Sequence, residues 1–274
     1  MTLTTTRCGD LELRWGERTY VMGILNLTPD SFSGDGLGDD VGAALAQAKR
    51  MADEGADIID IGGESTRPAA PTVSADEELR RVMPVIEKLA GELSVPMSID
   101  TYKSEVASRA VHAGAAMIND VWGLGRDPRL AQVAAEAGVP IILASYLQDA
   151  VRCDIITEVI TSLEKGIKQA MEAGVAGQNI IIDPGIGFGK NPEQNLEIIR
   201  RLAELKALNK PILLGTSRKF KLNQPPDQRL EATAATLAIG IAHGADMVRV
   251  HDVGQMVKVC RMSDVIIRRR PIGN

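Results

Sequence analysis

Residues 179–190 combine the residue types most suited to chemistry in this chain. Three consecutive isoleucines there predict a buried β-strand, because β-branched side chains pack well on a covered, pleated surface. Asp183 follows directly, and Gly185, Gly187 and Gly189 then alternate with other residues before Lys190. Glycine lets the backbone turn sharply and approach a ligand closely. A carboxylate beneath such a loop predicts a ligand site at the carboxyl end of a strand.

Polar side chains follow most of the other predicted strands as well. Asp100, Asn119 and Asp183 together suit a ligand with several N–H donors, such as an aminopyrimidine ring. A second group of cationic and hydrogen-bonding residues predicts a rim that binds phosphate, because arginine forks match phosphate oxygens. The polar residues expected at the strand ends are Asn26, Thr66, Arg67, Asp100, Asn119, Asp120, Asp183, Ser217, Lys219, Arg249 and His251. Five of them form the predicted rim: Asn26, Arg67, Ser217, Arg249 and His251.

Strands and helices must alternate to place these residues together. The predicted strands are 21–25, 58–61, 96–100, 117–120, 140–143, the stretch from residue 179, 212–215 and 247–250. The predicted helices are 41–54, 76–90, 104–112, 128–136, 154–173, 193–208, 229–243 and 255–267. A glycine directly follows the helix end in five of the helix-to-strand connections, which is typical of a helix cap with left-handed backbone. Eight such units favour a closed (β/α)8 barrel, the TIM barrel, over an open doubly wound sheet, since polar residues follow nearly every strand.

The whole chain, 1–274, is predicted to be one such domain, with residues 1–19 as a short N-terminal β-hairpin that covers one end. The 274 residues are 45% hydrophobic and 24% charged, enough for one large core. The net charge of −5 and the 3% aromatic content argue against binding to nucleic acid or an anionic membrane. Cys8, Cys153 and Cys260 form no metal-binding spacing, so we expect a reducing, cytoplasmic location.

Two common site types do not fit the sequence. Residues 185–190 lack the spacing of a nucleotide-binding P-loop, although Lys190 follows glycines. Closely spaced histidines or paired carboxylates that would mark a tight metal site are missing from the sequence. Any metal is therefore expected to be Mg²⁺, held loosely by ligand phosphates and one or two side chains.

Seven segments resemble the dihydropteroate synthase family in order and register. They are residues 26–33, 60–68, 98–103, 118–120, 183–190, 216–219 and 249–252. The resemblance implies that para-aminobenzoate and 6-hydroxymethyl-7,8-dihydropterin diphosphate condense to 7,8-dihydropteroate and diphosphate. It also implies Mg²⁺ as cofactor and a homodimer. Leu237, Ile241, Val257 and Met262 are candidate interface residues, although the same apolar stripe is what any barrel helix packs inward.

The same resemblance assigns residue roles. It implies catalytic roles for Asp100, Asp183, Lys219 and Arg249. It implies a pterin site of Asp100, Asn119, Asp183, Phe188 and Lys219. It implies a diphosphate site of Asn26, Arg67, Arg249 and His251, with Asn26 also binding the metal, and a para-aminobenzoate site of Phe32, Thr66, Pro68 and Ser217.

One segment departs from the family pattern. After the fifth predicted strand the family usually carries a Met-His-Met type segment, whereas this chain has Ala144, Ser145, Tyr146, Leu147 and Gln148. Tyr146 or Leu147 is the candidate to replace the missing wall of the pterin pocket. The change keeps open a pterin-binding paralogue that is non-catalytic or has altered specificity. A corrinoid-linked methyltetrahydrofolate methyltransferase module ranks behind, because it would lack the arginines of the diphosphate site.

Overall fold

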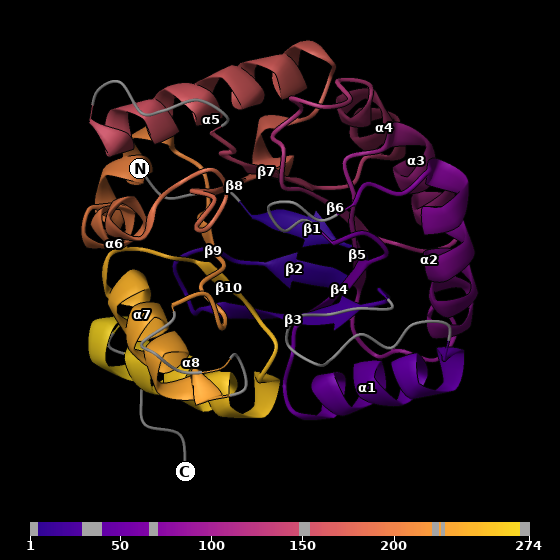
Figure 1. The fold of residues 1–274 in the computed structure, drawn as a ribbon, viewed down its shortest axis with the longest axis horizontal. Coiled ribbons are helices and arrows are strands. Elements are labelled where there is room, and N and C mark those ends of the chain that lie inside the picture. Colours follow the sequence, from indigo (N-terminus) through magenta and orange to yellow (C-terminus); the bar gives the residue numbers. More distant parts are fainter. Residues whose placement is uncertain are drawn as a thin grey trace.

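Eight parallel strands form the central sheet of the computed structural model, which describes residues 5–28, 40–65, 71–147, 154–220, 225 and 228–268. The strands are β3 (Tyr20–Asn26), β4 (Ile58–Gly62), β5 (Met97–Asp100), β6 (Met117–Asp120), β7 (Ile141–Ala144), β8 (Ile180–Asp183), β9 (Leu213–Leu214) and β10 (Met247–Val250). Their order is β8-β7-β6-β5-β4-β3-β10-β9. A parallel bridge between Ile182 and Ile212 joins the two ends, so the sheet closes into the predicted barrel (Figure 1).

Helices follow the strands and surround the barrel (Figure 1). They are α1 (Val41–Asp53), α2 (Ala75–Leu89), α3 (Ser104–His112), α4 (Leu130–Ala137), α5 (Ile155–Glu172), α6 (Pro192–Arg200), α7 (Leu230–Ala242) and α8 (Val253–Arg268), with 3-10 helices η1 (Gly177–Asn179) and η2 (Leu202–Leu208). The prediction of one helix over 193–208 is wrong, because the chain changes to 3-10 geometry after α6. Hydrophobic residues spaced three or four apart fit both helix types, so the pattern alone does not separate them.

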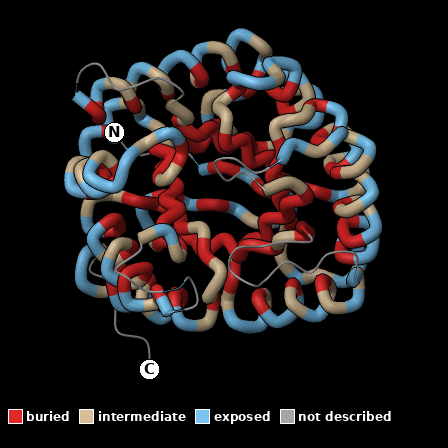
Figure 2. The backbone as a smooth tube through the Cα atoms, in the orientation of Figure 1, coloured by how far each residue is buried: buried red, intermediate tan, exposed pale blue. Residues whose placement is uncertain are grey.

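Side chains on the two faces of the barrel strands enter two different cores. Outward-facing residues pack against the helices, whereas inward-facing residues fill the barrel interior. The inner core contains Met22, Ile58, Met117, Ile142, Ile181, Leu213 and Met247. Figure 2 shows buried residues around the barrel and exposed residues on the outer sides of the helices. The apolar inner layer lies toward the amino-terminal ends of the strands, which leaves the carboxyl ends for polar residues.

An antiparallel hairpin covers the amino-terminal end of the barrel, as predicted. It consists of β1 (Thr6–Cys8) and β2 (Leu11–Leu13). Cys8, Leu13 and Trp15 are buried in the same core as the inward-facing strand residues. The Trp15 indole N–H donates to Thr6 Oγ1 at 2.8 Å, so these two buried polar groups of the hairpin region are hydrogen-bonded to each other.

The five glycines at the helix-to-strand joints have the predicted left-handed backbone, with φ between 67° and 117°. These residues are Gly55, Gly114, Gly138, Gly174 and Gly244. Within the described parts of the chain, none of the helices combines the length and apolar character needed to cross a membrane.

Candidate active site

The carboxyl ends of the barrel strands carry a buried polar layer. Asp100 of β5 pairs in register with Asn119 of β6, and Asp183 of β8 pairs with Ala144 of β7. Asp60 lies inside the barrel two residues after Ile58, because side chains alternate between the two faces of a strand. All three carboxylates and the amide are almost fully buried. The structure therefore brings the predicted set of acids and amide together and adds Asp60 to it.

Arg249 of β10 lies among these acids. Its Nε donates to Asp60 Oδ2 and its Nη2 to Asp100 Oδ2, both at 2.6 Å. Asn119 Nδ2 donates to the same Asp60 oxygen at 2.9 Å. Arg249 was predicted to lie outside the acids, and its side chain is 18% exposed against 0% for Asp60 and 5% for Asp100, although it pairs with both. It occupies the inward position two residues after Met247, and a guanidinium at that depth requires carboxylate partners.

Burial dominates the electrostatics of this layer. Burial raises the pKa of Asp100 to about 7, against the opposing charge of Arg249, and the Asp60 carboxylate adds to the increase. Burial also raises the pKa of Asp183, and Lys219 opposes this. For Arg249, burial works against the charge, but the Asp60 and Asp100 carboxylates outweigh it and raise the pKa above its ordinary value.

Two carboxylate oxygens in the layer have unused capacity to accept hydrogen bonds. Asp60 Oδ1 and Asp100 Oδ1 are buried and accept no hydrogen bond from any described residue. A buried acceptor without a partner is costly, so a natural ligand for it carries N–H or O–H donors. The layer is therefore suited to a planar ring with several N–H groups.

Lys219 brings a cation next to Asp183. A Cβ atom on Gly215 would lie 3.8 Å from Lys219 Nζ and 3.9 Å from Asp183 Oδ2, so the two groups flank this glycine. Lys219 Nζ donates to the Ile186 carbonyl at 2.6 Å and lies 4.5 Å from the centroid of the Phe188 ring. Burial lowers the pKa of Lys219 to about 8.

The glycine loop after β8 is locked against the loop after β7. A Cβ atom on Gly185 would lie 2.1 Å from the Ser145 carbonyl oxygen, and one on Gly189 would lie 1.6 Å from that of Leu147. Lys190 Nζ donates to the carbonyls of Ser145 (2.6 Å), Gly185 (3.1 Å) and Phe188 (3.1 Å). Lys190 thus joins the two loops, which agrees with the rejection of a P-loop.

Ser217 and His251 meet near the end of β10, as the predicted rim requires. Ser217 Oγ lies 2.9 Å from His251 Nδ1 and accepts the His251 backbone N–H at 3.2 Å. Asn26 ends β3 and is half-buried. Of the remaining predicted site residues, Phe32, Thr66, Arg67 and Pro68 lie outside the described residues.

Asn26 offers one side-chain oxygen of the type that Mg²⁺ prefers, 3.9 Å from where a Cβ atom on Gly62 would lie. The nearby Asp100 Oδ2 is occupied by Arg249. In the described ranges, no three His, Cys, Asp or Glu side chains come together as a metal site. This donor set suits an ion whose other ligands are phosphate oxygens and water.

Residues 22–251 match the family model described as "Pterin binding enzyme". The chain is 50% identical over 261 residues to "Dihydropteroate synthase" of Bacillus subtilis (strain 168), covering 94% of this chain and 92% of that protein. The chain belongs to the dihydropteroate synthase family.

Other relatives agree over nearly the full length. The "Dihydropteroate synthase" of Clostridium beijerinckii is 48% identical over 96% of this chain and 100% of its own. The solved dihydropteroate synthase of Xanthomonas albilineans with 4-aminobenzoic acid is 40% identical with a TM-score of 0.90, covering 98% of this chain and 100% of that one. A structure of the Clostridium difficile enzyme in the presence of pteroic acid is 49% identical with a TM-score of 0.88, covering 93% and 98%.

Two features of the site were not predicted from the sequence. Asp60 entered the prediction only as part of a segment that resembles the family, although its spacing from Ile58 is a signal that it faces inward. The packing of Trp122 on Tyr146, with ring centroids 3.8 Å apart, has no local signal at all, since the two residues are far apart in sequence.

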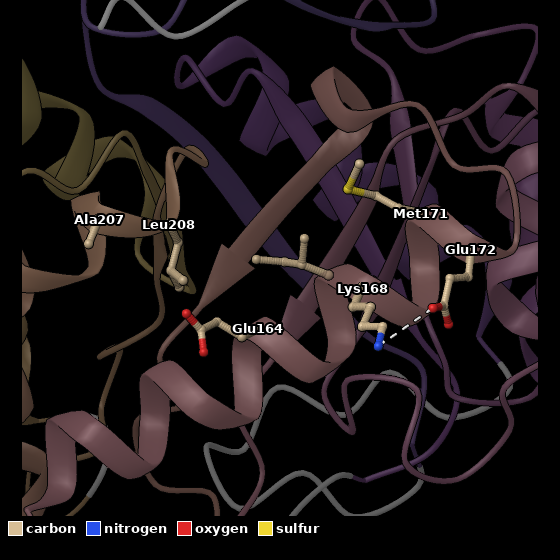
Figure 3. Close-up of a pocket in the computed structure, with 7 residues that line it drawn as sticks. Glu164, Lys168, Met171, Glu172, Ala207 and Leu208 are labelled. Atoms are coloured by element: carbon tan, nitrogen blue, oxygen red, sulfur yellow. Dashed lines mark ion pairs between the residues drawn. The ribbon is translucent and has the colours of Figure 1, made fainter.

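A shallow depression of about 550 Å³ lies away from the strand ends, between α5 and η2 (Figure 3). It is lined by Glu164, Ile167, Lys168, Met171, Glu172, Ala207 and Leu208. The charged side chains are on the helix surface, and Lys168 pairs with Glu172 at 3.8 Å. Such an exposed i,i+4 pair is common on helices and stabilises little, and none of the lining residues is a predicted site residue.

Proposed function

We propose that this chain condenses 6-hydroxymethyl-7,8-dihydropterin diphosphate with para-aminobenzoate to give 7,8-dihydropteroate and diphosphate. The observation that carries the proposal is the buried polar layer of Asp100, Asn119 and Asp183 beside Lys219, in which one carboxylate oxygen of Asp100 lacks a partner among the described residues. The membership of the dihydropteroate synthase family supports the same reaction.

The acidic layer binds the pterin ring. The carboxylates of Asp100 and Asp183 accept hydrogen bonds from ring and amino N–H groups, and the Asn119 amide completes the set. Lys219 donates to a ring acceptor, and Phe188 packs beside it. When diphosphate leaves, positive charge develops on the exocyclic methylene and spreads into the ring, where the fixed carboxylates stabilise it.

Arg249, His251 and Arg67 neutralise the leaving diphosphate. Arg249 releases Asp100 as the pterin N–H groups take over that carboxylate, and the freed Nη2 turns to phosphate while Nε stays on Asp60. Asn26 would hold Mg²⁺, which supplies further charge neutralisation to the diphosphate when it is bound. Phe32, Thr66, Pro68 and Ser217 orient the arylamine, so positioning contributes much of the rate.

A coupled assay with both substrates and Mg²⁺ tests this function. We expect dihydropteroate formation by the purified protein and its loss in Asp183→Asn and Arg249→Ala, with circular dichroism of both variants unchanged. Removal of Mg²⁺ with EDTA should also stop turnover. Tight binding of pterin diphosphate by the wild-type protein without product would instead support the non-catalytic paralogue, and near-normal turnover by either variant would refute the residue roles.

We further propose that the protein is a homodimer that associates through α7 and α8. Four large apolar side chains are exposed there: Ile239 by 48%, Met262 by 56%, Ile266 by 67% and Ile267 by 38%. Such residues in water favour association. Of the four interface candidates from the sequence, Leu237, Ile241 and Val257 are wrong, because all three are buried in the core of their own chain, and only Met262 remains.

A further inference from the structure

Arg218 lies between two residues of the site and has an unusual backbone conformation. Ser217 precedes it and Lys219 follows it. Its φ is 57°, in the left-handed region that residues with a side chain rarely adopt. Such a conformation persists where surrounding contacts enforce it, and it is frequent at functional sites. The contacts of Arg218 therefore indicate what this conformation serves.

The backbone of Arg218 is held by the amino-terminal end of α7. Its N–H donates to Thr233 Oγ1 at 3.0 Å, and its carbonyl accepts from Arg229 Nη1 at 2.8 Å. Thr233 Oγ1 in turn donates to the Arg229 carbonyl at 2.9 Å. Arg229 and Thr233 are both buried, so these bonds are shielded from water. The left-handed backbone at Arg218 is thus fixed on both sides of its Cα atom.

The side chain of Arg218 crosses to the loop after β10. Its Nε and Nη2 donate to the two carboxylate oxygens of Asp252, at 3.0 and 2.7 Å. Such a two-bond fork fixes direction as well as distance. The two side chains are 15% and 22% exposed, so the pair is partly shielded from solvent and salt. The Arg218–Asp252 fork therefore joins the loop after β9 firmly to the loop after β10.

The residues next to this fork are residues of the proposed site. Ser217 Oγ lies 2.9 Å from His251 Nδ1 and accepts the His251 backbone N–H at 3.2 Å. Ser217 and His251 directly precede Arg218 and Asp252 in the chain, so the two contacts between the loops are adjacent. On the other side of Arg218, Lys219 extends to the buried acidic layer. The turn at Arg218 thus sends its own side chain to Asp252 while both neighbours reach the site.

We propose that Arg218 and Asp252 form a positioning clamp, which fixes Ser217 against His251 and holds Lys219 beside the acidic layer. The inference rests on the proposed function and deepens it, because these two residues act through their neighbours and not on a substrate. The strain of the left-handed backbone at Arg218 is offset by the fork and by the hydrogen bonds from α7. The cost is accepted at this position because an ordinary backbone there would redirect Ser217 and Lys219.

Arg218→Gly and Arg218→Ala separate positioning from stability. Both remove the fork, but glycine adopts a positive φ readily, whereas alanine keeps the strain. We expect Arg218→Gly to unfold at a higher temperature than Arg218→Ala, within about 4 °C of wild type. In both variants kcat/KM for the pterin substrate should fall about 10- to 100-fold. Activity that recovers together with stability from alanine to glycine would overturn the clamp, since a merely structural residue behaves in that way.

Asp252→Ala removes the fork without changing the backbone of Arg218. It should reproduce the loss of kcat/KM, and the double variant Arg218→Gly/Asp252→Ala should be no less active than the weaker single variant. Two residues that act through one interaction show this non-additivity. If the two losses multiply in the double variant, the clamp is overturned.

Arg18→Ala is the matched control. Arg18 makes the same kind of fork with Asp57, at 2.9 and 2.6 Å, at the amino-terminal end of the barrel. Its removal should leave kcat/KM within about twofold of wild type, because distant sites act independently. A loss as large as that of Arg218→Ala would show that any broken fork slows turnover, and the specific role would be overturned.

The NMR signals of the His251 ring test the clamp without substrates. The chain has three histidines, so His251→Gln assigns these signals. Arg218→Gly and Asp252→Ala should shift them in the same direction as Ser217→Ala does, while the signals of the other two histidines stay in place. Unchanged His251 signals in both variants would overturn the clamp.

The outcomes distinguish this inference from the proposed function. If wild type forms no dihydropteroate, the synthase function fails, and the His251 signals still decide whether the clamp exists. If wild type turns over and Arg218→Gly retains both kcat/KM and the His251 signals, only the clamp is overturned.

Discussion

Asp60 is buried and accepts hydrogen bonds from two residues of the proposed site, Arg249 and Asn119. Its substitution therefore tests the proposed geometry most directly. One oxygen of its carboxylate accepts from both Arg249 Nε and Asn119 Nδ2, at 2.6 and 2.9 Å. Asp60→Asn keeps the shape of the side chain and an acceptor for both donors, but it removes the charge. We expect Arg249 to lose its fixed position, because among the described residues Asp100 then remains as its one hydrogen-bonded carboxylate partner.

The contacts of Asp60 indicate how much stability and activity the substitution should cost. A hydrogen bond to a charged group contributes about 1.5–3 kcal/mol, and an acceptor remains in Asp60→Asn, so the free energy of unfolding should fall by about 1–3 kcal/mol. The rate effect should be larger, since misplacing a binding group by about 1 Å can cost roughly 100-fold. We expect kcat/KM for the pterin substrate to fall by about 10- to 100-fold. The pKa of Asp100 should also decrease, because the Asp60 charge helps to raise it.

Asp57→Asn is the matched control at the other end of β4. Asp57 accepts two hydrogen bonds from Arg18, at 2.9 and 2.6 Å, far from the strand ends that form the site. Urea unfolding and steady-state kinetics should be measured on both variants. We expect both to lose stability, and only Asp60→Asn to lose activity. Equal kcat/KM in the two variants would refute the view that Asp60 positions Arg249.

Two further predictions concern charge and association. Burial raises the pKa of Asp100 to about 7, so the ionised form that accepts N–H donors is a minor species at pH 6. The pterin alcohol without diphosphate should therefore bind about tenfold more weakly at pH 6 than at pH 8. Calorimetry should show this slope in wild type and a smaller one in Asp100→Asn, and a flat wild-type profile would contradict the assignment. Met262→Glu places a charge on the exposed apolar face of α8 and should convert a dimer to a monomer in analytical ultracentrifugation. The unfolding temperature of the monomer should be retained. An unchanged dimer would exclude this face as the interface.

The barrel could be predicted from the sequence because its signals are local. Apolar strand segments, helical periodicity and glycine at five helix ends each depend on neighbouring residues, and together they specify alternating strands and helices. The strand-end acids could be predicted for the same reason, since a parallel barrel brings all carboxyl ends to one face. The hairpin over the amino-terminal end also followed from short-range alternation.

Other features depend on contacts between distant segments, which no local pattern reports. The pairing of Arg249 was not predicted because its partners are acids on β4 and β5, 189 and 149 residues away in sequence. The break after α6 was missed because one hydrophobic spacing fits two helix geometries.

The amino-acid sequence by itself determined the order of strands and helices, the family resemblance and the set of polar residues at the strand ends. Only the tertiary structure decided which of those residues touch: Arg249 with Asp60 and Asp100, Lys190 with the Ser145 carbonyl, and Tyr146 with Trp122. The physical reason is that all of these groups are wholly or partly removed from water, so losing a contact partner costs free energy. A charge or ring removed from water must find its partner within a few ångströms, and closure of the barrel determines which partner is there.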